Sequence, residues 1–270
     1  MSVRKGYVDT DEGQIHYRYG GESHAGDPPV LCFHQNPSSS LMFEDLIRGL
    51  EDDYHVIAFD IPGYGQSYEP DDVTTFSYYT DVLTQAIDNL DVDRFHVLGH
   101  HTGAGTGVEI AVNEADRVET VCFIGPPYFS RAEREEILED SYGESPDEAV
   151  PPVEPDGRHL LHHWELFDGQ PIDAETQHRM ALDALNSRTG AKQAHGVGRD
   201  QNFPDLFAEI EVPRLLMAAE GDLLWEAFCR AREDYPDVDT VEVGGAMLEP
   251  VADPDSVTSE VRRFLREHGY

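Results

Sequence analysis

Continuous apolar runs recur along this chain and alternate with segments of helical periodicity. A strand buried on both faces of a parallel sheet is apolar at consecutive positions, whereas an antiparallel edge strand alternates apolar and polar residues. Strands that alternate with helices predict an α/β fold with a doubly wound, mostly parallel sheet. The predicted strands are Gln14–Tyr19, Pro29–Phe33, Val56–Phe59, Phe95–Leu98, Val118–Ile124, Pro213–Ala218 and Thr240–Val243. The predicted helices are Leu41–Leu50, Tyr78–Leu90, Thr106–Asn113 and Asp255–His268.

The alternation stops between about Pro126 and Pro204, where the chain is helical, acidic and rich in proline. Helices are predicted there at Glu133–Asp140, His159–Phe167 and Ala174–Asn186. We therefore expect a core made of residues 1–125 and 205–270. Residues 126–204 are predicted to form a helical cap, inserted after strand 6, that acts as a lid.

A strand, a tight turn and a helix meet at residues 97–105, which read Val-Leu-Gly-His-His-Thr-Gly-Ala-Gly. In the G-x-S-x-G pattern the middle residue occupies a tight turn that pushes its side chain into the site. Here Gly99 and Gly103 supply the two small positions, and the apex is His101. An imidazole can take up a proton or bind a metal, but it is a poor acyl-transfer nucleophile.

Five motifs, in order and at normal spacing, resemble those of the α/β-hydrolase superfamily of the helical-cap type, and the resemblance covers nearly the whole chain. They are His-Gln-Asn-Pro at 34–37, Asp-Ile-Pro-Gly-Tyr-Gly-Gln-Ser at 60–67, the turn at 97–105, Glu-Gly-Asp at 220–222 and Gly-Gly-Ala at 244–246. The resemblance implies the α/β-hydrolase fold and, most often in that superfamily, hydrolysis.

Two of the three catalytic positions implied by the resemblance depart from the superfamily pattern. The apex, where relatives carry serine, aspartate or cysteine, is His101, and the position of the general-base histidine is Ala246. The acid position is kept as Asp222. We call this arrangement a degenerate triad.

The two departures suggest a linked change. Loss of an imidazole at Ala246 leaves space beside Asp222, and the His101 side chain is long enough to point into it. We predict that His101 hydrogen-bonds Asp222 and acts as a base on water or substrate without a covalent intermediate. The backbone N–H groups of Thr102 and of Gln35 or Asn36 are predicted to form an oxyanion hole.

Other residues are candidates for the pocket or its support. The set comprises His34, His100, Tyr128, Phe129, His162, His163, Trp164 and Trp225. His100 is interpreted as structural, and the cap histidines as either packing or a second base. Asp60 is interpreted as structural. The spacing of His34, His100 and His101 matches no established metal-ligand motif, so we expect no metal, and the predicted chemistry needs no cofactor.

The composition limits the possible partners. Acidic residues number 54 against 19 basic ones, which gives a formal net charge of −35 spread along the whole chain. This acidic surface resembles cytosolic proteins of salt-accumulating archaea, which implies a halophilic source. We expect no nucleic-acid or membrane partner, because no basic patch and no apolar span is present. Cys32 and Cys122 lie in apolar runs. We therefore expect them to be buried free thiols of a protein in the reducing cytoplasm.

Three functions remain open from the sequence. The first is hydrolysis of a small ester- or carbonyl-type substrate by the predicted His101–Asp222 base. The second is a cofactor-independent lyase or decarboxylase that uses the same base. The third is a non-catalytic protein that binds a small molecule. The sequence is compatible with a monomer or a homodimer.

Overall fold

A computed structural model describes residues 3–23, 26–71, 74–142, 150–198 and 201–268. The predicted cap range, 126–204, includes residues 143–149 and 199–200, which lie outside the described residues. Within these ranges no helix is long and apolar enough to cross a membrane.

The predicted α/β architecture is confirmed by an eight-stranded sheet with the strand order β1-β2-β4-β3-β5-β6-β7-β8. The first two strands form an antiparallel hairpin, β2 pairs antiparallel with β4, and all other neighbours are parallel. The strands are β1 (Arg4–Asp9), β2 (Gln14–Gly20), β3 (Val30–Phe33), β4 (Val56–Phe59), β5 (Phe95–His100), β6 (Val118–Ile124), β7 (Arg214–Ala218) and β8 (Asp239–Glu242).

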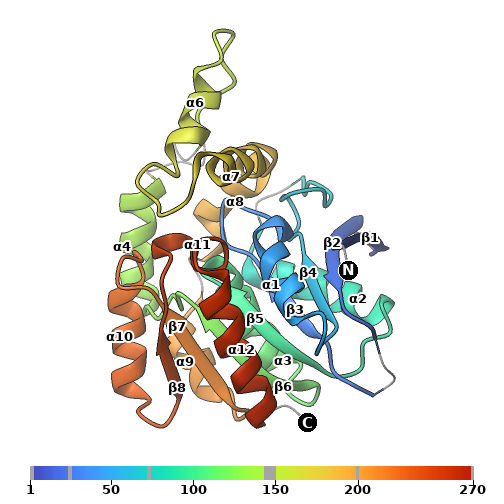
Figure 1. Ribbon diagram of the computed structural model, residues 1–270. Helices are drawn as coiled ribbons and strands as arrows, with labels where there is room; N and C mark the ends of the chain where they lie inside the picture. The colour runs from blue at the N-terminus through green and yellow to red at the C-terminus, as the bar shows by residue number, and fades with distance from the viewer. Residues whose placement is uncertain (1–2, 24–25, 72–73, 143–149, 199–200, 269–270) are drawn as a thin grey trace.

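Helices cover both faces of this sheet (Figure 1). One face packs against η1 (Ser40–Phe43), α1 (Glu44–Leu50), η2 (Ala246–Leu248) and α12 (Pro254–His268). The other packs against α2 (Phe76–Asn89), α3 (Thr102–Asn113), α9 (Phe203–Glu209) and α10 (Trp225–Asp234). Along β3, Val30 and Cys32 point into the first core, and Leu31 and Phe33 into the second. Both faces are buried, which is why the parallel strands are apolar without interruption.

Between β6 and β7 the chain runs through helices and adds no strand in the described residues. They are α4 (Arg131–Tyr142), α6 (Arg158–Glu165), α7 (Ala174–Asn186) and α8 (Arg188–Val197), followed by α9. Figure 1 shows α6 projecting away from the sheet, with α7 and α8 nearer to it. Phe203 and Phe207 of α9 pack against Phe123 of β6, so this helix belongs to the sheet's core.

Several elements differ from the sequence-based expectation, among them β1, α3 and α11. The edge strand β1 was not predicted, because its sequence is mostly polar and four of its six residues are exposed. Helix α3 begins at Thr102 and not at Thr106, since the glycine-rich turn 103–107 lacks the pattern by which a helix is predicted. The short α11 (Glu249–Ala252) carries a buried glutamate, Glu249, that the sequence did not single out.

Candidate active site

His101 occupies the turn between β5 and α3 with a left-handed backbone (φ 50°, ψ −111°). An L-residue with a positive φ is strained, and such strain is typical of functional turns. A Cβ on Gly103 would collide with the backbone of Phe33, so only glycine lets the first turn of α3 pack against the end of β3. The strained backbone of His101 and the close packing at Gly103 therefore fix the position of the apex side chain.

The predicted contact between His101 and Asp222 is present. The Nε2 atom of His101 lies 2.9 Å from Oδ2 of Asp222, and the two residues are 7% and 5% exposed. The backbone N–H of Leu224 donates to the other carboxylate oxygen at 2.9 Å. Burial opposes ionisation of Asp222, but His101 and the N–H donor outweigh it and lower the pKa of the carboxyl.

Gly125 lies directly behind this pair. Its φ is +53°, and a Cβ there would meet the His101 ring and Oδ2 of Asp222. Ala246 is the first residue of η2, where it follows Gly245 and has a φ of 51°. A Cβ on Gly221 would come within 3.3 Å of the Ala246 methyl group, so Ala246 borders the loop that carries Asp222.

A second buried histidine–carboxyl contact lies next to the first, since the rings of His100 and His101 are in contact. Nε2 of His100 is 3.0 Å from Oε2 of Glu249, and both residues are 0% exposed. The backbone N–H of Ala219 donates to Oε1 of Glu249 at 3.2 Å. Burial, followed by the charge of Asp222, raises the pKa of Glu249 to about 10. Sequence reasoning missed Glu249 because a glutamate before a proline at a helix start is most often exposed.

A cavity of about 260 Å³ opens at the elbow. Five predicted residues line it: His101, Thr102, Gln35, Asn36 and Phe129. The remaining wall is mostly apolar and comes from Pro37, Pro127, Arg134, Ile137, Leu166, Phe167, Leu223, Leu224, Met247 and Leu248. The N–H of Thr102 is the first of α3, and such groups have no acceptor within their own helix.

The other predicted pocket residues lie outside the lining of this cavity. Tyr128 donates its hydroxyl to Asp234 at 2.8 Å, and Trp225 packs against Phe228. Trp164 is partly buried and packs against the hydrophobic cluster that includes Phe167 and Met180. We therefore do not include these aromatic side chains in the proposed site.

The predicted histidines are also held elsewhere. Nδ1 of His34 lies 2.8 Å from the carbonyl oxygen of Gln35, and its Nε2 accepts from the N–H of Ile61 at 3.0 Å. Burial lowers the pKa of His34 to about 4. His163 contacts the carbonyl oxygen of His159 at 2.7 Å, and its neighbour His162 packs against the His163 ring.

Three neighbouring histidines, His34, His100 and His101, could suggest a metal site. Both ring nitrogens of His34 are, however, engaged within the protein. Donor atoms of His100, His101 and Glu249 lie within 4.8 Å of one another. Each of these two histidines already hydrogen-bonds a carboxyl group, Asp222 for His101 and Glu249 for His100. The described contacts thus account for this cluster as a hydrogen-bonded network.

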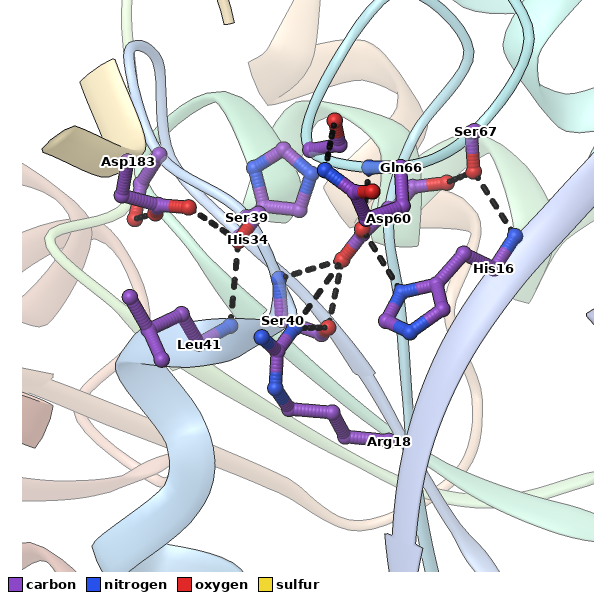
Figure 2. A network of polar contacts seen from close by, with 12 residues as sticks. His16, Arg18, His34, Ser39, Ser40, Leu41, Asp60, Gln66, Ser67 and Asp183 are labelled. Carbon is purple, nitrogen blue, oxygen red and sulfur yellow. Dashed lines mark hydrogen bonds and ion pairs between the residues drawn. The ribbon is translucent and has the colours of Figure 1, made fainter. Parts of the chain in front are cut away.

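A separate polar network surrounds Asp60 (Figure 2). Asp60 is fully buried and accepts from the N–H of Ser40 and of Gln66, both at 2.8 Å, while Nδ1 of His16 lies 2.8 Å away. A cavity of about 400 Å³ adjoins it and is also lined by Arg18. Asp60 ties β2, η1 and the loop after β4 together.

Comparison with known proteins shows which family and which proteins this chain is similar to. Residues 28–155 match the family model described as the alpha/beta hydrolase fold. Haloalkane dehalogenase 2 of Mycobacterium bovis is 29% identical over 217 residues, which cover 79% of this chain and 68% of that protein.

Solved structures give the same likeness at lower identity. The enol-lactonase from Burkholderia xenovorans LB400 has a TM-score of 0.75 at 20% identity, with 97% of this chain and 100% of that chain covered. The bromoperoxidase from Bacillus anthracis has a TM-score of 0.80 at 19% identity, with 98% and 100% covered. These proteins are named for different reactions, so their names do not define the reaction of this chain.

Proposed function

We propose that this chain, which has the α/β-hydrolase fold, is an enzyme that hydrolyses a small ester- or carbonyl-type substrate, with His101 as its base. One observation carries the proposal: the imidazole at the elbow apex hydrogen-bonds a buried carboxylate at 2.9 Å and lines an apolar cavity. Asp222 fixes the tautomer by accepting from Nε2–H of His101, which makes Nδ1 the basic nitrogen.

The proposed step uses water as the nucleophile. Nδ1 of His101 takes a proton from water as the oxygen attacks the substrate carbonyl carbon. The resulting oxyanion is stabilised by the N–H groups of Thr102 and of Gln35 or Asn36. When the intermediate collapses, the imidazolium returns the proton to the leaving alkoxide, so an ester and water yield an acid and an alcohol.

The degenerate triad is part of the same proposal. A serine at the apex needs a separate base, and Ala246 offers none. Placing the imidazole at the apex joins the base to the acid directly and omits the covalent step. Asp222 can serve both arrangements, because its carboxylate contacts His101 while the preceding residue, Gly221, faces Ala246.

The cap completes the proposed site. Arg134, Ile137, Leu166 and Phe167 come from the range 126–204, while Leu223 and Met247 come from the core. We propose that residues 126–204 form a cap over the cavity and that its side chains select a small, largely apolar substrate.

The test is a screen of esters and carbonyl compounds at high salt, which screens the charge of −35. Wild type is compared with His101→Ala and His101→Ser, and turnover in ¹⁸O-water follows the source of oxygen. Loss of turnover in both variants, with ¹⁸O in the acid product, supports the proposal. Turnover gained only in His101→Ser would show a hydrolase scaffold without its nucleophile. Tight ligand binding without turnover, unchanged in His101→Ala, would show a binding protein.

The second candidate is a cofactor-independent lyase or decarboxylase. The mostly apolar wall of the cavity favours it, since a dry site protects a carbanion formed by proton abstraction. The same screen separates the two reactions. Release of a substrate fragment without uptake of ¹⁸O would establish the lyase and overturn hydrolysis.

A further inference from the structure

We propose that the side-chain amide of Gln35 binds a hydroxyl group on the carbon next to the scissile carbonyl, so that the substrate is a small hydroxy ester or hydroxy-carbonyl compound. The inference rests on the proposed function, because it names the substrate class of the same site. It gives the side chain of Gln35 a role in specificity, which is separate from the backbone N–H groups of the oxyanion hole.

The side chain of Gln35 is buried without a hydrogen-bond partner. The residue is 6% exposed and lines the cavity at the elbow. In the described part of the chain its one hydrogen bond is made by its backbone carbonyl oxygen, which accepts from Nδ1 of His34 at 2.8 Å. The amide therefore keeps both its donor, the Nε2 amino group, and its acceptor, Oε1, for a ligand in the cavity.

The residues on either side of Gln35 use their polar side chains within the protein. His34 holds the Gln35 carbonyl through Nδ1, and its Nε2 accepts from the N–H of Ile61 at 3.0 Å. Oδ1 of Asn36 accepts from the hydroxyl of Tyr64 at 3.2 Å. These contacts fix the loop on both sides of Gln35. The loop is thus held in place by its neighbours and does not need the Gln35 amide for this purpose.

The packing of α3 places Gln35 beside the proposed oxyanion hole. A Cβ on Gly103 would collide with the backbone of Phe33 and would lie 2.8 Å from the carbonyl oxygen of His34. The start of α3 therefore packs directly against the residue that precedes Gln35. Thr102 and Gln35 line the same cavity from the two sides of this contact. A substrate group that reaches the Gln35 amide is consequently only a few bonds from the carbonyl carbon.

A hydroxyl group suits this amide because it can pair with either of its ends. The amide donates through nitrogen and accepts through oxygen, and a hydroxyl both donates and accepts. A methyl group at the same place would leave the amide without a partner in a cavity from which the ligand has displaced water, and this opposes binding. The wall is otherwise mostly apolar, so a polar group at this point fixes how the substrate lies.

The first measurement is a binding comparison that needs no turnover. The ligands are α-hydroxyacetophenone and propiophenone, two ketones of equal size that carry a hydroxyl and a methyl group at the same position. NMR titrations give the dissociation constant of each ligand for wild type and for Gln35→Met, which keeps the length of the side chain and removes the amide. We expect the substitution to weaken binding of the hydroxyketone about tenfold and to change binding of propiophenone by less than about twofold.

The matched control is Gln177→Met. Gln177 of α7 donates to the carbonyl oxygen of Trp164 at 3.1 Å and to Oδ1 of Asp168 at 2.9 Å, and it is not among the residues that line the cavity. Both ligands should bind this variant as they bind wild type. Unchanged binding of the hydroxyketone to Gln35→Met, or an equal loss for the two ketones, would overturn the proposal.

The second measurement separates specificity from a structural role. An amide that makes no hydrogen bond in the ligand-free protein adds none to folding, so Gln35→Met should leave the urea midpoint unchanged or raise it. A lowered midpoint, or a variant that does not fold, would show that the amide supports the structure and would overturn the proposal.

The third measurement applies once turnover is established. The two substrates are ethyl 2-hydroxybutanoate and ethyl 2-methylbutanoate, which again differ by a hydroxyl in place of a methyl group. We expect the ratio of their kcat/KM values to fall about tenfold in Gln35→Met, and an unchanged ratio would overturn the proposal. Failure of the proposed function would appear differently, as turnover that survives His101→Ala, and it would leave the binding comparison of the two ketones intact.

Discussion

His101 and His16 each contact a buried aspartate, at 2.9 Å and 2.8 Å, yet the two pairs have different surroundings. At Asp60 the N–H groups of Ser40 and Gln66 and the hydroxyl of Ser40 also donate, and Arg18 lies 3.8 Å away. Asp60 is saturated with donors and joins three segments of the core. Asp222 accepts one backbone N–H and faces a second carboxyl group.

The comparison shows that a buried histidine–aspartate pair does not by itself define an active site. Cavity size does not separate the two, because the cavity at Asp60, about 400 Å³, exceeds the one at His101, about 260 Å³. The His101 pair differs in its strained apex, the helix N-terminus beside it and its apolar wall. We therefore propose the chemistry at the His101 pair and interpret the His16 pair as structural.

The largest expected effect separates the two histidines by activity. Glutamine at position 101 keeps a donor near Nε2, and asparagine at position 16 keeps one near Nδ1, so each variant preserves its contact but removes the base. We expect His101→Gln to lower kcat/KM by about 10³-fold or more, and His16→Asn to change it by less than about threefold. Steady-state kinetics on the same substrate measure both. An equal loss in His16→Asn would break the comparison.

The next effect separates the two aspartates by stability. Asp60→Asn removes a charge that at least three donors satisfy, so we expect it to lower the free energy of unfolding by about 3 kcal/mol. Asp222→Asn removes a charge that one backbone N–H and His101 satisfy, so it should cost less than about 1.5 kcal/mol. Urea unfolding at one fixed high salt concentration gives both values. A larger loss of stability in Asp222→Asn than in Asp60→Asn would show that the structural role belongs to the His101 pair.

Much of the fold could be predicted from apolar runs, since β4 and β6 occur at the predicted residues and most other strands begin or end within two residues of them. A strand buried on both faces is apolar at consecutive residues, and this run can be recognised in the sequence. The edge strand β1 carries no such signal, because its residues are mostly exposed.

The site was partly predictable for a different reason. The missing imidazole at Ala246 and the extra one at His101 indicated the contact with Asp222, because the motifs fix the place of all three residues in the fold. Glu249 could not be found in this way, since its burial depends on tertiary packing of α11 that no motif records. Of the cap residues that line the cavity, Phe129 was predicted, whereas Arg134, Ile137, Leu166 and Phe167 were missed for the same reason.

A substitution of Gly125 tests the His101–Asp222 pair from a third direction, the space beside it. Gly125→Ala places a methyl group against His101 and Asp222 at a φ of +53°. We expect at least a tenfold loss of kcat/KM and about 2 kcal/mol of stability, of which about 1 kcal/mol comes from the backbone alone. Gly169→Ala is the matched control, because its φ is +79° and no atom lies within 4 Å of the new methyl group. It should lose the backbone part only and keep its activity; equal kinetics in the two variants would contradict the proposed site.

The smallest expected effect concerns the link between the cap range and the Asp60 network. Asp183 of α7 accepts from the hydroxyls of Ser38 at 3.0 Å and Ser39 at 2.5 Å. Burial raises the pKa of Asp183 to about 6 from 3.8. The folded protein therefore holds this proton at a pH where the unfolded chain has lost it, so the group's contribution to stability falls as pH rises.

Between pH 5 and pH 7, this group should lower the free energy of unfolding of the wild type by about 1 kcal/mol relative to Asp183→Asn, which cannot titrate. Urea unfolding of both proteins at pH 5, 6 and 7 measures the difference, with kcat/KM followed in parallel. Parallel stability curves would show that Asp183 is ionised throughout. A change in kcat/KM that follows the titration would instead connect the Asp60 network to the chemistry at His101, and the separation of the two pairs would no longer hold.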